Sequence, residues 1–222
     1  MGNKATKENK TNKVIPAKIM IIRHAEKPGA YGDKNVVYFG VDQAGNTDEE
    51  SLVTLGWQRA GGIASLFAPR KPLQAAGLSL LEQPTAIYAS DPIATKKEPS
   101  QRPFQTVSAL ASKLGITVDI KFKGEDFKDM VSEVLTKSKA KDVVLISWQH
   151  QDILAKAKGV DSIVAEIVAQ TQSSLAGLPT KPWPGDRYDM VLVFDQVKNG
   201  QYTRFRQVPQ MLLAGDQSTL FL

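Results

Sequence analysis

Short apolar runs recur along the chain and predict strands. Continuous apolar character, typical of strands buried on both faces, extends over Lys18 to Ile22, Ala86 to Ser90 and Asp142 to Ser147. Thr117 to Phe122 alternates between apolar and polar residues, which predicts a further strand. Near the end of the sequence, two strand-like runs flank Asn199-Gly200, the strongest short signal for a β-hairpin. These two runs are Met190 to Val197 and Gln201 to Gln207.

Segments with helical spacing of apolar residues separate the strands. We expect helices over Thr54 to Phe67, Pro103 to Leu114, Glu125 to Thr136 and Asp161 to Ser174. The second helix has the clearest boundaries, because Pro103 suits a first helical turn and Gly115 suits the residue after the last one. Strands that alternate with helices predict an α/β fold with three layers, α/β/α. We expect a mostly parallel central sheet with a C-terminal β-hairpin.

The pattern favours one domain over residues 16–222, preceded by a basic, disordered tail over residues 1–15. Four lysines lie in that tail, and a weak contact with nucleic acid or a membrane is the alternative interpretation. Two loops are long: Gly29 to Glu50 is polar and Gly-rich, and Asp91 to Gln101 contains two prolines. A connection as long as the first is functional or mobile, so we expect it to act as a lid or specificity element.

Composition narrows the function. The chain has no cysteine, which excludes disulfides and thiolate chemistry and fits a reducing, cytoplasmic location. No apolar run approaches the roughly 20 residues that span a bilayer, so we expect no stable membrane association. The net charge is +5, but no interleaving of basic and aromatic residues suggests a nucleic-acid partner. The oligomeric state has no signal in the sequence.

Only two histidines occur, and each follows a predicted buried strand. His24 ends Ile-Met-Ile-Ile-Arg-His, and His150 ends Val-Val-Leu-Ile-Ser-Trp-Gln-His. Open α/β sheets place their chemistry outside the carboxyl ends of their strands, so both imidazoles are expected at one edge. Arg23 follows the same strand as His24, and Arg102 lies at a helix start that favours an anion. Two guanidiniums with two imidazoles predict a phosphate site.

These residues carry a family resemblance. Arg23-His24-Ala25-Glu26 resembles the Arg-His-Gly-Glu signature of the histidine phosphatase superfamily, which includes the phosphoglycerate mutases. Three further segments are similar to the family's motifs in the same order, over about residues 17 to 195: the run from Leu52 to Ala60, Ser90 with Arg102 to Thr106, and His150 after its strand. Arg-His-Ala-Glu-Lys-Pro, Trp148-Gln149-His150 and the segment from Pro182 to Tyr188 look closest to bacterial members.

The chain also departs from the family's pattern. Arg59 stands where the family usually has glutamine, and Val53 where it usually has threonine. Ser90 and Arg102 are separated by an insertion, Asp91 to Gln101, where the family usually has three residues. Lys96 and Lys97 lie in that insertion and could lean over the site.

The resemblance implies a role for each site residue. His24 would be the nucleophile, with a loop carbonyl fixing the tautomer that leaves its attacking nitrogen unprotonated. Arg23 and Arg102 would hold the phosphoryl oxygens, and His150 would donate a further hydrogen bond to them. No metal or other cofactor is implied. The structural alternatives are a satisfied histidine at each strand end and an ordinary ion pair for each arginine.

The proton donor is the least determined part of the site. Protonation of the leaving oxygen requires an acid near the pocket mouth. The family places a glutamate after the Arg102-type helix, and Glu125 is the tentative choice, with Glu133, Asp152 and Asp91 as alternatives. Glu26 is expected to pair with a nearby cation or N–H. Together with Lys27 and Trp148 it is a tentative pocket residue, whereas Trp57 and Trp183 are expected in the core.

The sequence therefore predicts a phosphohydrolase that acts on small phosphomonoesters through a phosphohistidine. A mutase-type phosphotransferase and a catalytically weak phospho-ligand binding protein of the same fold remain alternatives. A metallohydrolase is disfavoured, because no compact cluster of His, Asp and Glu accompanies the two distant histidines. The sequence leaves the particular phosphoester open.

Overall fold

The computed structural model describes residues 14–30, 36–70, 80–93, 99–154 and 161–221. The predicted tail up to residue 13 lies outside the described residues, as do Lys96 and Lys97. Ile15, the last residue of the predicted tail, is 1% exposed and belongs to the core.

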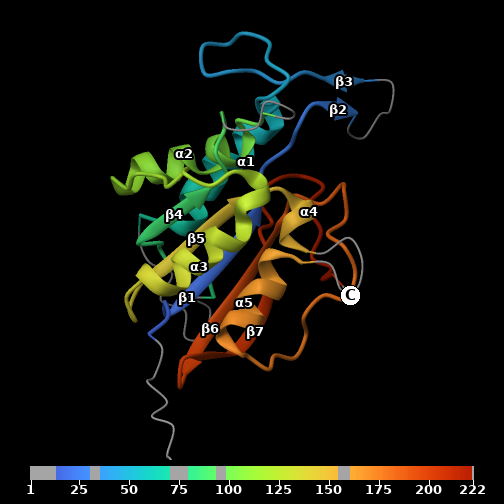
Figure 1. The fold of residues 1–222 in the computed structure, drawn as a ribbon. Helices are drawn as coiled ribbons and strands as arrows, with labels where there is room; N and C mark the ends of the chain where they lie inside the picture. The colour runs from blue at the N-terminus through green and yellow to red at the C-terminus, as the bar shows by residue number, and fades with distance from the viewer. Residues whose placement is uncertain (1–13, 31–35, 71–79, 94–98, 155–160, 222) are drawn as a thin grey trace, which may run out of the picture.

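A central sheet organises the described part of the chain (Figure 1). Its five strands follow the spatial order β4 (Ala86–Ala89), β5 (Val143–Trp148), β1 (Lys18–Arg23), β6 (Met190–Lys198) and β7 (Gln201–Pro209). β4, β5 and β1 are parallel, and the hairpin β6–β7 adds two antiparallel strands beside β1. Arg23 pairs with Trp148, so the two histidine-bearing strand ends are adjacent. The predicted α/β class and C-terminal hairpin are confirmed.

Helices cover both faces of the sheet. α1 (Thr54–Phe67) and α2 (Arg102–Leu114) lie on one face, and α3 (Phe127–Lys137) and α5 (Ile163–Thr171) lie on the other (Figure 1). β1 shows why its sequence is continuously apolar: Ile19 and Ile21 pack into one core, and Met20 and Ile22 into the other. Successive strand side chains point to opposite faces, so a strand between two helical layers must be apolar throughout.

Local signals explain where several elements end. Asn199 and Gly200 have φ values of 53° and 73°, the left-handed pair required by a type I′ hairpin turn. Gly115 has φ 65° and ends α2 as predicted, although the helix begins at Arg102 rather than Pro103. α5 is shorter than the predicted helix, because Ser162 caps its start and Gln172 adopts a left-handed conformation at its end.

Two segments differ from the sequence-based prediction. Thr117 to Phe122 is not a strand: the segment forms one isolated parallel bridge, between Asp119 and Tyr88 of β4. The predicted helix from Glu125 divides into a 3₁₀ turn, η1 (Gly124–Asp126), followed by α3. The Gly-rich loop after β1 contains a small two-stranded sheet, β2 (Gly29–Ala30) with β3 (Val37–Tyr38).

Gly56 fixes how closely α1 approaches the segment after β1. A Cβ added there would lie 2.7 Å from the Glu26 carbonyl oxygen and 3.0 Å from the Glu26 nitrogen. We therefore expect Gly56→Ala to destabilise the protein by about 1–3 kcal/mol, despite alanine's higher helix propensity. Gly61 lies in the same helix, and its added Cβ would meet nothing within 4 Å. Gly61→Ala should stabilise by about 0.5–1 kcal/mol, and urea unfolding of both variants measures the difference in sign.

Candidate active site

His24 lies one residue past β1, and its surroundings fix both its position and its tautomer. Its backbone N–H donates to the Trp148 carbonyl across the gap to β5, at 2.9 Å. The side chain is 5% exposed, and Nδ1 lies 2.7 Å from the Ala25 carbonyl oxygen. A carbonyl only accepts, so Nδ1 carries the proton and Nε2 keeps its lone pair. This is the tautomer that a nucleophilic imidazole requires.

Positive groups gather around this imidazole. Burial lowers the pKa of His24 well below its ordinary value, and the neighbouring charge of Arg23 lowers it further. Arg102 and His150 act in the same direction, while the hydrogen bond to the Ala25 carbonyl opposes them. The fold therefore brings together four sequence-predicted residues from the ends of β1 and β5 and the start of α2.

The lowered pKa has a direct consequence for the pH dependence. The His24 ring should stay neutral well below pH 6.5, where an ordinary histidine becomes protonated. Because the chain has only two histidines, NMR titration of the two imidazoles, with His150→Gln for assignment, measures this midpoint. Arg102→Met should raise the midpoint, since it removes a positive neighbour. A midpoint at or above 6.5 in the wild type would contradict the described environment.

Arg23 is held by a loop far away in the sequence. The residue is 0% exposed, and Nη1 donates to the carbonyl oxygens of Gly185 at 2.8 Å and Arg187 at 2.9 Å. Its guanidinium lies 3.8 Å above the ring centroid of Tyr188. The same tyrosine ring lies 6.1 Å from the His24 ring. Tyr188 is thus part of the candidate site, although sequence analysis identified it only as part of a segment similar to bacterial members.

The start of α2 is tied directly to the His24 segment. Thr106 Oγ1 accepts a hydrogen bond from the Ala25 N–H at 2.8 Å and donates to the Arg102 carbonyl at 2.7 Å. Arg102 Nη1 donates to the Glu49 carbonyl at 2.8 Å, which joins the loop before α1 to the same corner. Ser147 Oγ on β5 donates to the Pro103 carbonyl at 2.9 Å. These bonds fix the N-terminus of α2, where N–H groups favour an anion, against the segment that carries His24.

The structure distinguishes among the four candidate acids. Glu125 is exposed in η1, which contacts the end of β5 through a 3.1 Å hydrogen bond from Trp148 Nε1 to the Gly124 carbonyl. Asp152 lies in α4 (His150–Ile153), next to His150, and accepts a hydrogen bond from Gln149. Asp91 Oδ1 accepts from the Ile93 N–H at 2.8 Å within its own turn. These contacts leave Glu125 and Asp152 as candidates near the strand end.

Glu133 is poorly suited to be the acid. Burial alone would raise its pKa, but hydrogen bonds from Lys121 and Lys137 lower it below the ordinary value. A general acid at neutral pH needs the opposite shift. Glu133 is therefore a structural ion-pair residue of α3.

Glu26 is occupied by a buried ion-pair network. Arg59 Nε lies 2.9 Å and Nη2 lies 2.7 Å from Glu26 Oε1, and Nη2 also lies 2.6 Å from Asp216 Oδ1. Gln210 completes the network by accepting from Arg59 Nη1 at 3.1 Å. The expectation that Glu26 pairs with a cation is confirmed. Arg59, which stands where the family usually has glutamine, supplies that cation. A buried arginine needs a carboxylate partner, so this departure was the signal that could have identified the network.

One of the tentative pocket residues, Trp148, needs correction. Trp148 is 0% exposed and packs in the core beneath α3 and α5, so it presents no surface to a substrate. Glu26 borders a cavity, but its carboxylate is already bonded to Arg59. Lys27 is exposed. Trp183 belongs to the core as expected, and Trp57 is half-buried against a smaller apolar cluster.

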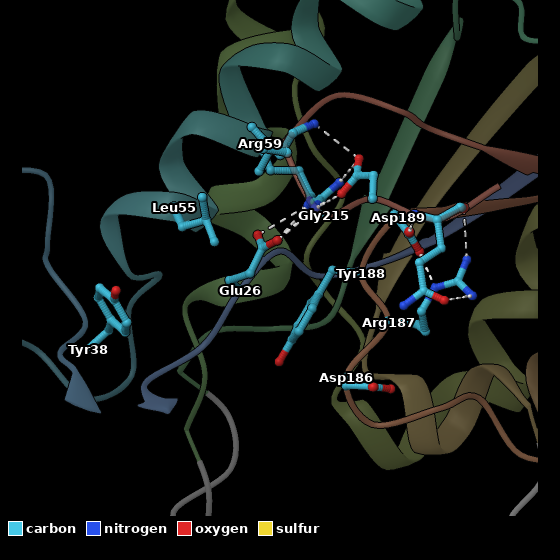
Figure 2. Close-up of a pocket in the computed structure, with 13 residues that line it drawn as sticks. Glu26, Tyr38, Leu55, Arg59, Asp186, Arg187, Tyr188, Asp189 and Gly215 are labelled. Carbon is cyan, nitrogen blue, oxygen red and sulfur yellow. Dashed lines mark hydrogen bonds and ion pairs between the residues drawn. The ribbon is translucent and has the colours of Figure 1, made fainter. Parts of the chain in front are cut away.

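A cavity of about 440 Å³ lies beside Glu26, Arg59 and Tyr188 (Figure 2). Its wall comes from the segment after His24, from α1, and from the two loops that precede β6 and follow β7. Tyr188 and Glu26 belong to this wall, so the cavity adjoins the His24 site. This cavity was not predicted from the sequence, because the segments that line it lie far apart along the chain.

The described residues form neither a candidate metal cluster nor a helix that could cross a membrane. No three or more His, Cys, Asp or Glu side chains there are grouped so that they could hold a metal ion. None of the described helices combines the length and apolar character needed to cross a membrane.

Comparisons with known proteins give only distant likenesses. No family model and no curated protein matches the chain. The SixA protein of Agrobacterium tumefaciens, assigned as a phosphohistidine phosphatase, is a similar solved structure: 17% identity, 87% of this chain, 96% of that chain and a TM-score of 0.38. A mycobacterial glucosyl-3-phosphoglycerate phosphatase is similar at 11% identity, over 87% of this chain and 97% of its own, with a TM-score of 0.43. These likenesses are weak, so the function proposed below depends on the site itself.

Proposed function

We propose that the protein is a phosphohydrolase that cleaves phosphomonoesters through a phosphohistidine on His24. The observation that supports this most strongly is the 2.7 Å contact between His24 Nδ1 and the Ala25 carbonyl, which leaves Nε2 as a lone-pair donor among Arg23, Arg102 and His150. The resemblance of Arg23-His24-Ala25-Glu26 to the histidine phosphatase signature points to the same chemistry.

The proposed reaction has two steps. Nε2 of His24 attacks phosphorus, the P–O bond to the alcohol breaks, and the acid gives its proton to the leaving oxygen. Water then attacks the phosphorus atom of the phosphohistidine, and the deprotonated acid residue takes a proton from that water. The bond between phosphorus and Nε2 breaks, and inorganic phosphate leaves. Arg23, Arg102 and His150 hold the phosphoryl oxygens and stabilise the charge that a loose transition state spreads over them. Their positive charges perform the neutralisation that other phosphoryl-transfer sites assign to metal ions.

Phosphate release from a panel of phosphomonoesters, measured with and without a chelator, tests this function. The proposal expects turnover of at least one ester at an unchanged rate in the chelator. Complete inactivity across the panel, combined with tight binding of inorganic phosphate, would instead favour the phospho-ligand binding protein. Loss of activity on chelation would contradict the metal-independent mechanism. Transfer of phosphate to a concentrated alcohol in preference to water would favour the mutase-type phosphotransferase.

We propose Glu125 as the general acid, because it is exposed on the turn that contacts the end of β5. Glu125→Gln should lower kcat/KM, which reports the first step, for an alkyl phosphate by roughly 10²–10⁴-fold, since a poor leaving group needs protonation. It should have much less effect on 4-nitrophenyl phosphate, whose leaving group is a stable anion. Glu133→Gln is the matched control in α3 and should show no such dependence on the leaving group. Equal losses for both esters would remove Glu125 from this role and leave Asp152.

A further inference from the structure

The cavity shares a wall with the proposed phosphoryl site. Tyr188 lines the cavity, stacks beneath Arg23 at 3.8 Å and lies 6.1 Å from the His24 ring. Glu26, another lining residue, follows His24 by two positions. With a volume of about 440 Å³, the cavity falls in the range of small-molecule sites and far exceeds what a phosphoryl group needs. The additional space is therefore available to the rest of a substrate.

Two arginines line this cavity, but neither has donors left for an anion. Arg59 directs Nε, Nη1 and Nη2 at Glu26, Gln210 and Asp216. Arg187 is similarly saturated: Nε donates to Asp189 at 2.7 Å, and both terminal nitrogens donate to Gln217 and Thr219. Figure 2 shows most of these bonds as dashed lines within the wall. Both guanidiniums hold the wall together and do not serve as ligands.

The charge balance of the wall is negative. Four carboxylates line the cavity, Glu26, Asp186, Asp189 and Asp216, against the two guanidiniums. Three of them are bonded to Arg59 or Arg187. Asp186 is exposed, and no interaction is drawn between it and the other lining residues in Figure 2. The phosphoryl site has the opposite sign, since Arg23 and Arg102 lie there.

The remaining surface of the cavity is apolar or aromatic. Tyr38 comes from β3 and Leu55 from α1, while Leu213 and Ala214 come from the loop after β7. With Tyr188 they offer an aromatic and aliphatic surface next to an excess of negative charge. Such a surface suits an organic group that is uncharged or positive, and it repels a second phosphate or a carboxylate.

We infer that this cavity holds the leaving group of the substrate and selects phosphomonoesters of uncharged or cationic alcohols over those of anionic alcohols. This inference rests on the proposed phosphohydrolase function. The site thereby separates two tasks: the arginines near His24 bind the phosphoryl dianion, and the wall around Tyr188 binds the alcohol and rejects additional negative charge.

Three aryl phosphates of similar leaving-group acidity test the inference: 4-(hydroxymethyl)phenyl, 4-(aminomethyl)phenyl and 4-(carboxymethyl)phenyl phosphate. The kcat/KM for the aminomethyl and hydroxymethyl compounds should exceed the kcat/KM for the carboxymethyl compound by about five- to tenfold at low salt. The difference should shrink at high ionic strength, because exposed charges are screened. If 4-(carboxymethyl)phenyl phosphate is hydrolysed as well as the other two esters, the inference is overturned and the phosphohydrolase function remains intact.

Variants then locate the selection. Asp186→Asn should reduce the amine-to-carboxylate ratio of kcat/KM severalfold, and Ala214→Lys should reverse the preference. Asp129→Asn removes the same charge from exposed α3 outside the cavity wall, and it should leave the ratio unchanged. If Asp186→Asn and Ala214→Lys both keep the wild-type ratio, the cavity is not the leaving-group site. If the wild type hydrolyses other phosphomonoesters of the panel but none of these three, the inference fails and the proposed phosphohydrolase function stands.

Discussion

Replacing His24 with alanine should lower kcat/KM for 4-nitrophenyl phosphate by roughly four orders of magnitude or more, because the variant has no atom to accept the phosphoryl group. The other histidine cannot take over the role of His24, since His150 is assigned to hold the phosphoryl oxygens. His150→Ala should therefore be the milder variant, with a loss of about 10²–10³-fold in kcat. Steady-state kinetics of both purified variants measure the two effects.

Folding must be controlled in this comparison, because His24 is buried and its N–H joins β1 to β5. The hydrogen bond from the backbone does not depend on the side chain, so His24→Ala should retain the wild-type far-UV circular dichroism spectrum and cooperative unfolding. A folded His24→Ala protein that keeps its activity within tenfold of the wild type would contradict the covalent mechanism. A larger loss for His150→Ala than for His24→Ala would exchange their proposed roles.

Arg59→Met should destabilise the protein by about 3–5 kcal/mol, the second large effect that the structure predicts. Arg59 is 3% exposed and bonds to Glu26 and Asp216, so its removal leaves two buried carboxylates without their cation. Arg204→Met is a matched control, because Arg204 is 41% exposed and its partner Asp195 keeps Arg206. It should cost less than about 1 kcal/mol. Urea unfolding at neutral pH measures both free energies.

The pH dependence of the Arg59→Met effect has a definite sign. Burial alone would raise the pKa of Asp216, but Arg59 lowers it below the ordinary value. The wild type therefore gains stability from this carboxylate above the pKa of the unfolded chain and loses that stability as the pH falls through the folded-state value. In Arg59→Met the Asp216 carboxylate accepts a proton more easily, so the gap between variant and wild type should narrow toward acid. A gap that widens toward acid would contradict the described network.

The order of elements followed from sequence because each signal is local. Continuous apolar runs identified β1, β4 and β5, and Pro103 with Gly115 bounded α2 within one residue. The strand prediction over Thr117 to Phe122 was wrong, because its alternation does not specify a pairing partner and the segment forms only one isolated bridge, to Tyr88 of β4.

The site residues that follow strands could be predicted from the sequence, whereas those that lie in distant loops could not. His24 and His150 follow parallel strands, and such strands end at one edge. Strand alternation could also have excluded Trp148 from the pocket, since it shares a face with buried Val144 and Ile146 of β5. Tyr188 and Asp216 reach the site through loop conformations, for which a single sequence has no periodic signal.

Trapping the phosphoenzyme tests the central claim most directly. The protein is mixed briefly with a labile aryl phosphate, quenched under basic conditions, digested and examined by mass spectrometry. We predict a phosphoryl group on His24 that is stable to base, lost in acid and absent from His24→Ala. Turnover of the ester with no phosphohistidine at any quench time, or with the phosphoryl group on another residue, would contradict the account.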